Sequence, residues 1–520
     1  MRKATTVEKK VEQRNDVAHI AAIAVSVLIQ IIWIWSLFWR LQEKYVWVNM
    51  AVSLFALVLV LFIYGRRVNA AIKMPWIILI LVFPVLGVFF YLMVGWNPSI
   101  KQMKKRFAAI DSKLKPYLKK NIEEKDALRT WDRRAENIAS YLSGTAGYPV
   151  YADTDVEYYD DAAKGFAAQM DAIRGAKQFV FMEYHAIEDG ESFRPMKELL
   201  MQKAAEGVDV RLFYDEFGSA GFINKSFIKQ METGGVQCRV FNPLVPILNL
   251  FMNNRDHRKI TVVDGKIGFT GGYNLADEYF NITHPYGQWK DTGIRLEGAA
   301  VRTLTVLFLE MWNAIRATDW NDTDFSRFFP EAHSCQGGRG FIQPYADNPM
   351  DDKTTGEDVY MHVLGYASEY AYFATPYLII TDEMKKAFEL AARRGVDVRL
   401  VTPGIPDKKM IYRMTRSYYA GLAMAGVRIY EYTPGFCHCK QCVADDRIAT
   451  CGTINLDYRS LYHHFENGAV LYGGPAVQDI KADFDALFPQ CREVTEEYRY
   501  GRNTVLRIGQ CLLRLIAPLL

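Results

Sequence analysis

The sequence lacks a strong excess of either charge. Its 62 Lys and Arg residues nearly balance 59 Asp and Glu residues, which leaves a formal net charge of +3. Nucleic-acid-binding domains usually have a clear basic excess, so the overall charge gives no support for a nucleic acid partner. Cysteine is also scarce, with eight in 520 residues. Because they do not form the dense pattern of a disulfide-stabilised secreted scaffold, we expect the globular part to lie in a reducing compartment.

Apolar residues are concentrated near the beginning of the chain. Half of all residues are apolar, yet the mean hydropathy is −0.07. Three apolar stretches, at 17–39, 46–64 and 75–95, each approach the ~20 residues that a helix needs to cross a bilayer. We expect residues 1–100 to form a membrane region with two or three transmembrane helices, the first being either a span or an interfacial helix. The first stretch is too long for a signal-peptide core, and no small-residue cleavage site follows it.

Basic segments flank these stretches. We expect residues 101–135 to form a basic juxtamembrane linker or helix, with either a solvated face or a face that lies on anionic headgroups. Basic residues precede, separate and follow the apolar stretches, so counting them does not fix the orientation. We expect the globular part on the cytoplasmic side. At residues 501–520, arginines alternate with apolar residues and no acidic residue follows Glu497. This pattern predicts an amphipathic helix in the membrane interface or, alternatively, one packed on the core.

The globular part contains an internal duplication. The hexapeptide Gly-Val-Asp-Val-Arg-Leu occurs at 207–212 and again at 395–400, each time after a helical pattern. A strand-like run precedes each copy, at 178–185 and 370–378, and a His-x-Lys motif follows each. Runs of β-forming residues alternate with helical patterns, which predicts the α/β class. We expect two tandem domains, 136–330 and 331–500, each with a mixed β-sheet flanked by helices.

Each half has the same polar residues at the same offsets. The first half has His257, Lys259, Asp264, Gly271 and Asn274, and the second has His438, Lys440, Asp445, Gly452 and Asn455. A given histidine matches all four offsets by chance about once in 100,000. Two matches among nine histidines therefore indicate a shared function. We interpret six other histidines as structural and leave His185 open; the six are His19, His284, His333, His362, His463 and His464.

This residue set suits phosphodiester exchange. A histidine and a lysine two positions apart lie on one face of a β-strand, so both can reach one phosphate. The reaction needs a nucleophile, an acid for the leaving alkoxide and fixed positive charge at the phosphoryl oxygens. Two histidines, two lysines and two asparagines supply this set, so we expect no metal and no cofactor. Cys437, Cys439 and Cys442 beside His438 raise the alternative of a zinc site, which we disfavour because no second cysteine pair with ligand spacing lies nearby.

The paired motifs resemble those of the phospholipase D superfamily over residues 136–500. The resemblance implies that both halves contribute to one active site. There one histidine attacks phosphorus and forms a phosphohistidine, while the other protonates the departing alcohol and then deprotonates the incoming hydroxyl. We assign His257 as the nucleophile and His438 as the acid and base. Asp264 and Asp445 are expected in the catalytic set, and the expected supporting residues are Asn274, Asn455, Glu278, Glu466, Glu183 and Tyr184, with Glu278 and Glu466 as candidates to orient an imidazole.

Other stretches resemble cardiolipin synthases in particular. They include Glu183-Tyr184-His185, the segments 268–279 and 289–292, and the segments 430–432 and 455–460. The sequence departs from that family's usual residues at Cys439, Gly272 and Thr453, which leaves the histidines, lysines and asparagines intact.

The resemblance implies a membrane enzyme that joins two phosphatidylglycerol molecules into cardiolipin and glycerol. The expected partners are these lipids and the bilayer of a bacterial cytoplasmic membrane, with no nucleic acid; whether the protein forms an oligomer is left open. The same residues would serve a hydrolytic phospholipase D, or another phosphatidyltransferase with a different acceptor alcohol, and these alternatives stay open at the level of sequence.

Overall fold

A computed structural model describes residues 46–66, 68–92, 98–118, 121–220, 222–242, 254–315, 321–330, 339–351 and 353–500, and a few positions outside these ranges, among them 513–515 and 517–519. The predicted apolar stretch 17–39 lies outside the described residues, apart from Ile32 and Trp35. Most of the predicted C-terminal helix 501–520 also lies outside them.

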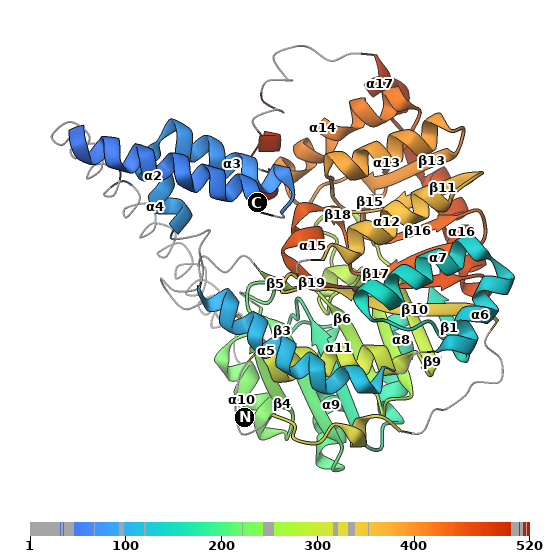
Figure 1. The fold of residues 1–520 in the computed structure, drawn as a ribbon. Helices are drawn as coiled ribbons and strands as arrows, with labels where there is room; N and C mark the ends of the chain where they lie inside the picture. Colours follow the sequence, from blue (N-terminus) through green and yellow to red (C-terminus); the bar gives the residue numbers. More distant parts are fainter. Residues whose placement is uncertain are drawn as a thin grey trace.

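A helical arm projects from the globular part (Figure 1). Helix α2 (Val46–Gly65) coincides with the predicted apolar stretch 46–64. The chain turns at Asn69, whose side chain accepts a hydrogen bond from Ala71 N and caps α3 (Ala70–Val82). A new helix, α4 (Pro84–Phe90), begins at Pro84, because proline cannot donate to the helical ladder. The expected single helix over 75–95 is therefore wrong. None of the helices in the described ranges combines the length and the apolar character that crossing a bilayer requires.

The basic segment after the arm packs on the globular part. It forms α5 (Pro98–Leu114), η2 (Lys115–Tyr117), α6 (Ile122–Trp131), α7 (Arg133–Tyr141) and η3 (Leu142–Ala146). Phe107 of α5 is buried and stacks on Phe465, with ring centres 5.0 Å apart. Lys101 and Lys105 of the same helix remain exposed. One face of α5 thus packs on the protein core, and basic side chains on the rest of the helix are exposed to solvent.

The first half is built on a seven-stranded mixed sheet. Its order is β1-β9-β7-β6-β2-β3-β4. Strands β2, β3 and β4, on one side of the sheet, are parallel, and the other pairs are antiparallel. The strands are β1 (Thr154–Tyr159), β2 (Phe179–Tyr184), β3 (Asp209–Asp215), β4 (Gln237–Phe241), β6 (Lys259–Val263), β7 (Ile267–Gly271) and β9 (Gly293–Gly298). The helices are α8 (Ala162–Arg174), α9 (Phe193–Ala205), α10 (Lys225–Thr233), η4 (Asp277–Phe280), α11 (Val301–Ala314) and η5 (Ser326–Phe328).

The second half repeats this topology strand for strand. Its order is β10-β19-β17-β16-β11-β13-β14, with β20 added at the edge. The strands are β10 (Phe341–Asp347), β11 (Tyr370–Ala374), β13 (Asp397–Pro403), β14 (Arg428–Tyr432), β16 (Gln441–Ala444), β17 (Ile448–Gly452), β19 (His464–Tyr472) and β20 (Cys491–Glu493). The helices are α12 (Thr355–Tyr366), α13 (Asp382–Arg393), α14 (Lys409–Ala425), α15 (Tyr458–Tyr462), α16 (Pro475–Leu487), η6 (Phe488–Gln490), α17 (Thr495–Arg499) and η7 (Ala517–Leu519). The prediction of an α/β protein with two mixed sheets is confirmed.

The repeated hexapeptide has a structural reason. Its glycines, Gly207 and Gly395, follow α9 and α13 and have φ values of +89° and +94°. Glycine adopts this left-handed conformation without the steric cost that a Cβ brings, so it can end a helix and turn the chain. The valines and leucines that follow are buried in β3 and β13.

Short strands also pair across the interface between the two halves. Strand β5 (Arg255–Asp256) pairs with β19, and β8 (Gln288–Lys290) pairs with β15 (Gly435–Cys437). A further short pair joins β12 (Leu378–Ile379) to β18 (Leu456–Asp457) within the second half. The first two pairs lie next to the His-x-Lys motifs, so the interface between the halves is also where the motifs lie.

Candidate active site

The two motif histidines line one cavity between the halves. The backbone N–H of His257 donates to the carbonyl of Phe465 (2.9 Å), and that of His438 donates to the carbonyl of Lys290 (2.8 Å). Each histidine backbone is therefore held by the opposite half. The cavity has a volume of about 580 Å³, and its walls include both histidines, Asn274 and Asn455. All four side chains are largely buried.

Each imidazole is oriented by a carboxylate from the opposite half. Nδ1 of His257 lies 2.9 Å from Oε2 of Glu466, and Nδ1 of His438 lies 2.6 Å from Oδ2 of Asp291. A carboxylate on Nδ1–H fixes the tautomer and leaves Nε2 for a substrate. Nζ of Lys440 also lies 2.7 Å from Nδ1 of His438. One nitrogen cannot donate to Asp291 and accept from Lys440 at once; the equivalent His257–Glu466 pair favours the carboxylate as the partner.

The strand register shows that these two carboxylates are equivalent. Gly271 pairs with Gly293 in the first sheet, and Gly452 pairs with Gly468 in the second, which aligns Asp291 with Glu466. Glu466 lies where the sequence predicts an orienting carboxylate, whereas Glu278 lies on the cavity wall and Asp291 occupies the position beside His438. A fixed offset misses Asp291, because it follows Asn274 by 17 residues and Glu466 follows Asn455 by 11.

The motif lysines add positive charge beside the histidines. Nζ of Lys259 donates to the carbonyl of His257 (2.7 Å), and both Lys259 and Lys440 are 1% exposed. Burial lowers the pKa of Lys259 to about 7, with Glu466 opposing this shift and Lys440 adding to it. Burial likewise lowers the pKa of Lys440. Two buried cations that disfavour each other's charge are suited to an anion placed between them.

The surroundings of both imidazoles favour their neutral form. Burial lowers the pKa of His257 well below its ordinary value, and the nearby cations Lys259 and Lys440 lower it further. Burial and the same two lysines have this effect on the pKa of His438. A neutral imidazole is the form that attacks phosphorus.

The asparagines approach the cavity from the turns after β7 and β17. Asn274 donates to the hydroxyl of Tyr279 (2.8 Å) and accepts from the backbone N–H of Ala186 (3.2 Å). Asn455 is 4% exposed, and among the described residues its Oδ1 has no hydrogen-bond partner. A buried amide oxygen without a partner costs free energy unless a ligand satisfies it.

The motif aspartates lie away from the histidines, which corrects the expectation that they support catalysis nearby. Asp264 lies seven positions beyond His257, which is roughly 20 Å along an extended chain. Asp264 has φ +53° and accepts from the backbone N–H groups of residues 177, 178 and 179 (2.8, 2.7 and 2.9 Å). Asp445 has φ +51° and accepts equivalently from residues 368, 369 and 370. Asp264 therefore connects the turn between β6 and β7 to the start of β2. Asp445 connects the turn between β16 and β17 to the start of β11 in the same way.

Glu183 and Tyr184 also lie outside the cavity, contrary to the prediction that they support it. Glu183 is fully buried, and burial and nearby Asp256 raise its pKa well above the ordinary value, so it keeps its proton. The Tyr184 hydroxyl contacts Gln169 and Thr261 inside the core of the first half. Both residues lie on β2, the strand that pairs with the motif strand β6.

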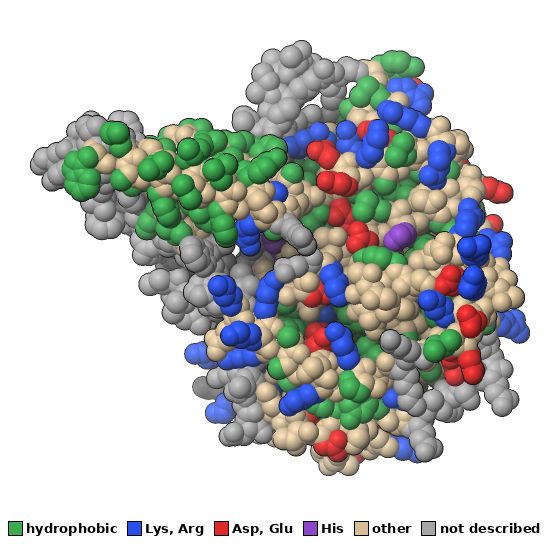
Figure 2. Space-filling model, in the orientation of Figure 1, with side chains coloured by type: hydrophobic (Ala, Val, Ile, Leu, Met, Phe, Trp, Pro, Cys, Tyr) green, Lys and Arg blue, Asp and Glu red, His purple; other side chains and the backbone are tan. Residues whose placement is uncertain are grey.

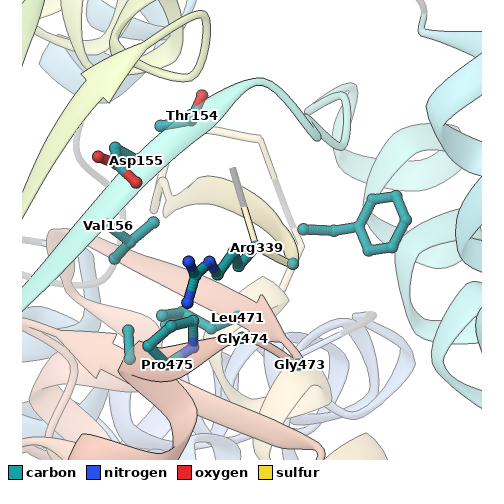
Figure 3. Close-up of a pocket in the computed structure, with 11 residues that line it drawn as sticks. Thr154, Asp155, Val156, Arg339, Leu471, Gly473, Gly474 and Pro475 are labelled. Carbon is teal, nitrogen blue, oxygen red and sulfur yellow. The ribbon is translucent and has the colours of Figure 1, made fainter. Parts of the chain in front are cut away.

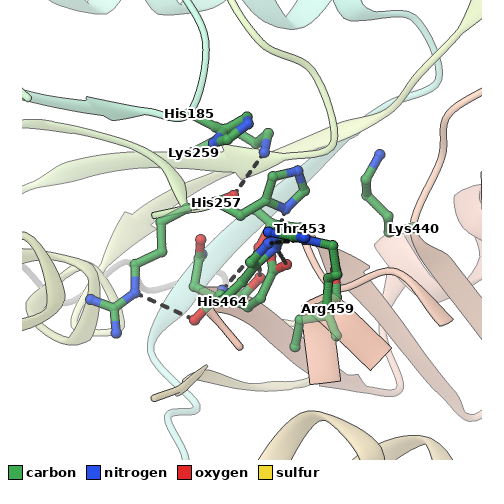
Figure 4. Close-up of polar contacts among 12 residues, drawn as sticks. His185, His257, Lys259, Lys440, Thr453, Arg459 and His464 are labelled. Carbon is green, nitrogen blue, oxygen red and sulfur yellow. Dashed lines mark hydrogen bonds and ion pairs between the residues drawn. The ribbon is translucent and has the colours of Figure 1, made fainter. Parts of the chain in front are cut away.

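Two further histidines lie beside the nucleophile candidate (Figure 4). The rings of His185 and His464 have their centres 5.0 Å and 5.4 Å from that of His257. Nδ1 of His464 lies 3.4 Å from Oε1 of Glu466, and its Nε2 accepts from Nε of Arg459 (3.2 Å). His464, interpreted from the sequence as structural, thus lines the cavity. The sequence contains a signal for this location: His464 precedes Glu466 by two residues, so both side chains lie on the same face of β19.

The described residues contain one group with donor atoms spaced for a metal ion, His257, His464 and Glu466, whose atoms lie within 4.8 Å of one another. Glu466 contacts both imidazoles, so this group also forms a His–carboxylate–His network. Cys437, Cys439 and Cys442 are outside it; they are buried free thiols.

A second cavity lies far from this chemistry (Figure 3). It has a volume of about 330 Å³, and Arg339 lies among residues of β1 and the β19–α16 turn. Its walls contain none of the predicted site residues. The interface cavity is therefore the candidate active site.

Two equivalent α/β halves, each with a His-x-Lys motif, and one cavity that both histidines line define the phospholipase D superfamily. Comparisons with known proteins agree. Residues 170–312 and 360–488 match the family model described as "Cardiolipin synthase, PLD-like domain", and residues 51–96 match the one described as "Phospholipase_D-nuclease N-terminal".

Curated relatives cover nearly the whole chain. Cardiolipin synthase 2 of Bacillus cereus is 32% identical over 471 residues, which are 90% of each chain. Cardiolipin synthase of Halalkalibacterium halodurans is 32% identical over 465 residues, 89% of this chain and 91% of the relative. An uncharacterized protein of Streptococcus mutans is 38% identical over 461 residues, 89% of this chain and 99% of the relative. The chain therefore belongs to the cardiolipin synthase family.

Among solved structures, phosphatidylserine synthase of Haemophilus influenzae has a similar fold. It is 14% identical, with a TM-score of 0.54, and the match covers 74% of this chain and 97% of that one. At this identity the likeness concerns the fold alone.

Proposed function

We propose that the protein is a cardiolipin synthase, which transfers a phosphatidyl group from one phosphatidylglycerol to another and releases glycerol. The observation that carries the proposal is the crossed pairing of His257 with Glu466 and of His438 with Asp291 at one cavity. It provides two oriented imidazoles with separate partners, as a reaction with a nucleophile and an acid requires.

In the first step, Nε2 of His257 attacks phosphorus of the donor lipid. The bond from phosphorus to the glycerol oxygen breaks, and His438 gives that oxygen its proton. Lys259, Lys440, Asn274 and Asn455 supply donors for the phosphoryl oxygens as charge moves onto them. The bound phosphodiester is an anion, so it raises the pKa of both imidazoles and favours the protonated His438 that this step needs.

In the second step, the neutral His438 removes a proton from the glycerol hydroxyl of the acceptor lipid. That oxygen attacks phosphorus, the bond from phosphorus to His257 breaks, and cardiolipin forms. Water is the competing acceptor. The rings of Trp289, Tyr279 and Phe436 pack around His438 with ring centres 5.1, 5.4 and 5.7 Å from it. These apolar surfaces reduce the access of water to the base and so support transfer over hydrolysis.

The proposal includes association with a bacterial cytoplasmic membrane. Large apolar side chains of α2 and α3 are exposed on the arm, as the green surface in Figure 2 illustrates, and exposed apolar patches of this kind mark protein or membrane contacts. We propose that the arm inserts into the bilayer. A cytoplasmic position of the two halves fits the described cysteines, since Cys238, Cys437, Cys439, Cys442, Cys451 and Cys491 are free.

The test is incubation of the purified full chain with labelled phosphatidylglycerol in detergent and a chelator, beside His257→Ala and His438→Ala. We expect cardiolipin and free glycerol from the wild type alone. After a neutral or alkaline quench, which preserves the acid-labile phosphohistidine, label should be detectable on the wild-type protein and absent from the His257→Ala protein. Phosphatidic acid as the main product would overturn the proposal in favour of a hydrolytic phospholipase D. Dependence of the reaction on added metal would overturn the proposed metal-free chemistry.

A further inference from the structure

Cardiolipin synthesis has a requirement that hydrolysis lacks: the acceptor is itself an anion. The incoming phosphatidylglycerol brings a second phosphate into the neighbourhood of the one that reacts. The lysines and asparagines of the two motifs are committed to the reacting phosphate. A second group of cations at the same cavity is therefore of interest.

Arg255 is one such cation. It lines the cavity, is 6% exposed, and lies opposite His464 in the β5–β19 pair. Its guanidinium stacks over Phe217 at 5.0 Å, and Nη1 donates to the carbonyl of Asn242 (3.4 Å). The carboxylate of Asp215 lies 3.8 Å from Nη1 of Arg255, beyond hydrogen-bond distance.

Asp215 is committed elsewhere. Its Oδ1 accepts from the backbone N–H groups of Phe217 and Gly218 (2.9 and 3.1 Å), and its Oδ2 accepts from that of Asp256 (3.1 Å). Burial raises the pKa of Asp215 to about 6, although Arg255 opposes the shift. A guanidinium has five N–H donors, so Arg255 keeps donors for a ligand.

Arg459 is the second cation of this group. It lines the same cavity from α15, and its Nε donates to Nε2 of His464 (3.2 Å). The ring of His464 in turn lies beside that of His257, so one imidazole separates Arg459 from the proposed nucleophile. Burial lowers the pKa of Arg459, and Arg255 is among the groups that lower it further, which indicates that the two guanidinium groups are near each other.

The other end of the cavity has the opposite character. Glu278 and Asp407 line it together with Lys408, whose Nζ lies 3.7 Å from Oδ2 of Asp407. Two carboxylates with one ammonium leave this end without a cationic excess. The two arginines thus lie beside His464, while most of the remaining cavity wall is apolar or aromatic.

We propose that Arg255 and Arg459 bind the phosphodiester of the acceptor phosphatidylglycerol. This inference rests on the proposed function and names the subsite that would make the enzyme a synthase. Paired guanidinium groups suit a phosphate because their N–H forks match its oxygens. Held there, the acceptor presents its glycerol hydroxyl toward the phosphohistidine one imidazole away. The same subsite would hold the second phosphate of the cardiolipin product.

Two reactions of the full-length protein in mixed micelles separate the acceptor subsite from the donor subsite. One is cardiolipin formation from phosphatidylglycerol, whose acceptor is an anion. The other is exchange of labelled glycerol into phosphatidylglycerol at low lipid mole fraction, whose acceptor is neutral. Both proceed through the same phosphohistidine. The variants are Arg255→Gln, Arg459→Gln and the double variant, with Arg255→Lys and Arg459→Lys to retain the charge. Arg428→Gln, which removes a cation outside the cavity, is the matched control.

We expect the ratio of cardiolipin formation to glycerol exchange to fall about tenfold in each single Gln variant and further in the double variant, through the KM for phosphatidylglycerol. The Lys variants should recover part of the ratio, and Arg428→Gln should leave it unchanged. An equal loss of both reactions would overturn the inference, because it would place the arginines at the donor phosphate or in the fold; an unchanged ratio would overturn it as well. A wild type that exchanges glycerol but makes no cardiolipin would contradict the proposed function itself, whatever the variants do.

Discussion

At the scale of single residues, the carboxylates opposite the histidines are the first targets. Glu466→Gln and Asp291→Asn keep the shape of each side chain and remove its charge. We expect each to lower kcat by about 10²- to 10⁴-fold, since carboxylates that orient catalytic histidines contribute on this scale. KM should change less, because neither carboxylate is among the residues that line the cavity. Steady-state kinetics of glycerol exchange measure both constants; a loss confined to KM would contradict the positioning role.

Asp291 also predicts a pH dependence of activity. Burial raises its pKa to about 6, although Lys440 and Lys259 oppose the shift. Below that pH the carboxyl takes a proton and no longer stabilises a charged His438. We expect activity to fall as the pH drops through about 6, and this limb to be absent from the Asp291→Asn profile. A low-pH limb that persists in the variant would assign the titration to another group.

The same raised pKa predicts a trade between stability and activity. The folded state binds the Asp291 proton more tightly than the unfolded state, whose carboxyl has a pKa near 4. The ionised carboxylate therefore costs stability, and the cost grows as the pH rises from about 4 to about 6. At pH 7 we expect Asp291→Asn to be more stable than the wild type by about 1–3 kcal/mol, with a smaller difference at pH 4.5. Urea unfolding at both pH values measures this, and a variant less stable at pH 7 would refute it.

For Asp264 and Asp445 we expect the opposite: their substitution should lower the stability of the protein and leave its activity. Each accepts from three consecutive backbone N–H groups at a residue with positive φ. Asp264→Ala and Asp445→Ala should each cost about 1–3 kcal/mol of unfolding free energy, because these hydrogen bonds are lost and alanine tolerates the left-handed conformation poorly. The activity per folded molecule should remain, in contrast to Lys259→Ala. A folded Asp264→Ala protein without activity would return this residue to the catalytic set.

At the scale of elements, the duplicated glycines allow the halves to be compared. A Cβ at Gly207 or at Gly395 meets no atom within 4 Å, but the φ values of +89° and +94° disfavour any other residue. Gly207→Ala and Gly395→Ala should each cost about 1–2 kcal/mol through backbone strain alone. Thermal unfolding of the two single variants measures the cost. Equal shifts are expected because the turns are equivalent, and a shift in only one half would show that the two turns differ in their surroundings.

The elements also show how far the sequence could be interpreted. Patterns within one element were sufficient for α2 and for strands β3 and β13, which begin within the repeated hexapeptides. The break at Pro84 lies inside a continuous apolar run, so hydropathy alone predicted one helix there. The Asp291–His438 pair depends on contact between the halves, and an insertion between Asn274 and Asp291 hides their equivalence with the second half. Asp264 and Asp445 keep their offset in both halves because the turn repeats, which is why spacing alone suggested a catalytic role for a structural residue.

At the scale of the whole molecule, direct contacts connect the base of the exposed apolar arm to an element of the active site. Asn69, at the turn between α2 and α3, donates to Glu383 and to the Tyr462 hydroxyl (3.2 Å each), and Tyr462 ends α15, the helix that contains Arg459. His463, the next residue, contacts the carbonyl of Pro518 (3.3 Å). The base of the arm therefore lies against α15, which contains Arg459, so a membrane that holds the arm would also lie near the proposed subsite for the acceptor lipid.

This arrangement predicts that damage to the arm impairs membrane binding and spares the chemistry. Leu54 and Leu61 of α2 are 66% and 64% exposed. A lysine in place of each costs about 2–3 kcal/mol inside a bilayer, so we expect Leu54→Lys/Leu61→Lys to bind phosphatidylglycerol vesicles about 100-fold more weakly in sedimentation. Glycerol exchange with a short-chain, micellar phosphatidylglycerol should be retained, because the arm contributes no residue to the cavity wall. Ile122→Lys, on α6, is the matched control: Ile122 is 69% exposed but lies on the globular part. Equal vesicle binding by the wild type, the double variant and Ile122→Lys would show that the arm does not hold the enzyme at the membrane. Loss of micellar activity in the double variant would show that the arm also supports the active site.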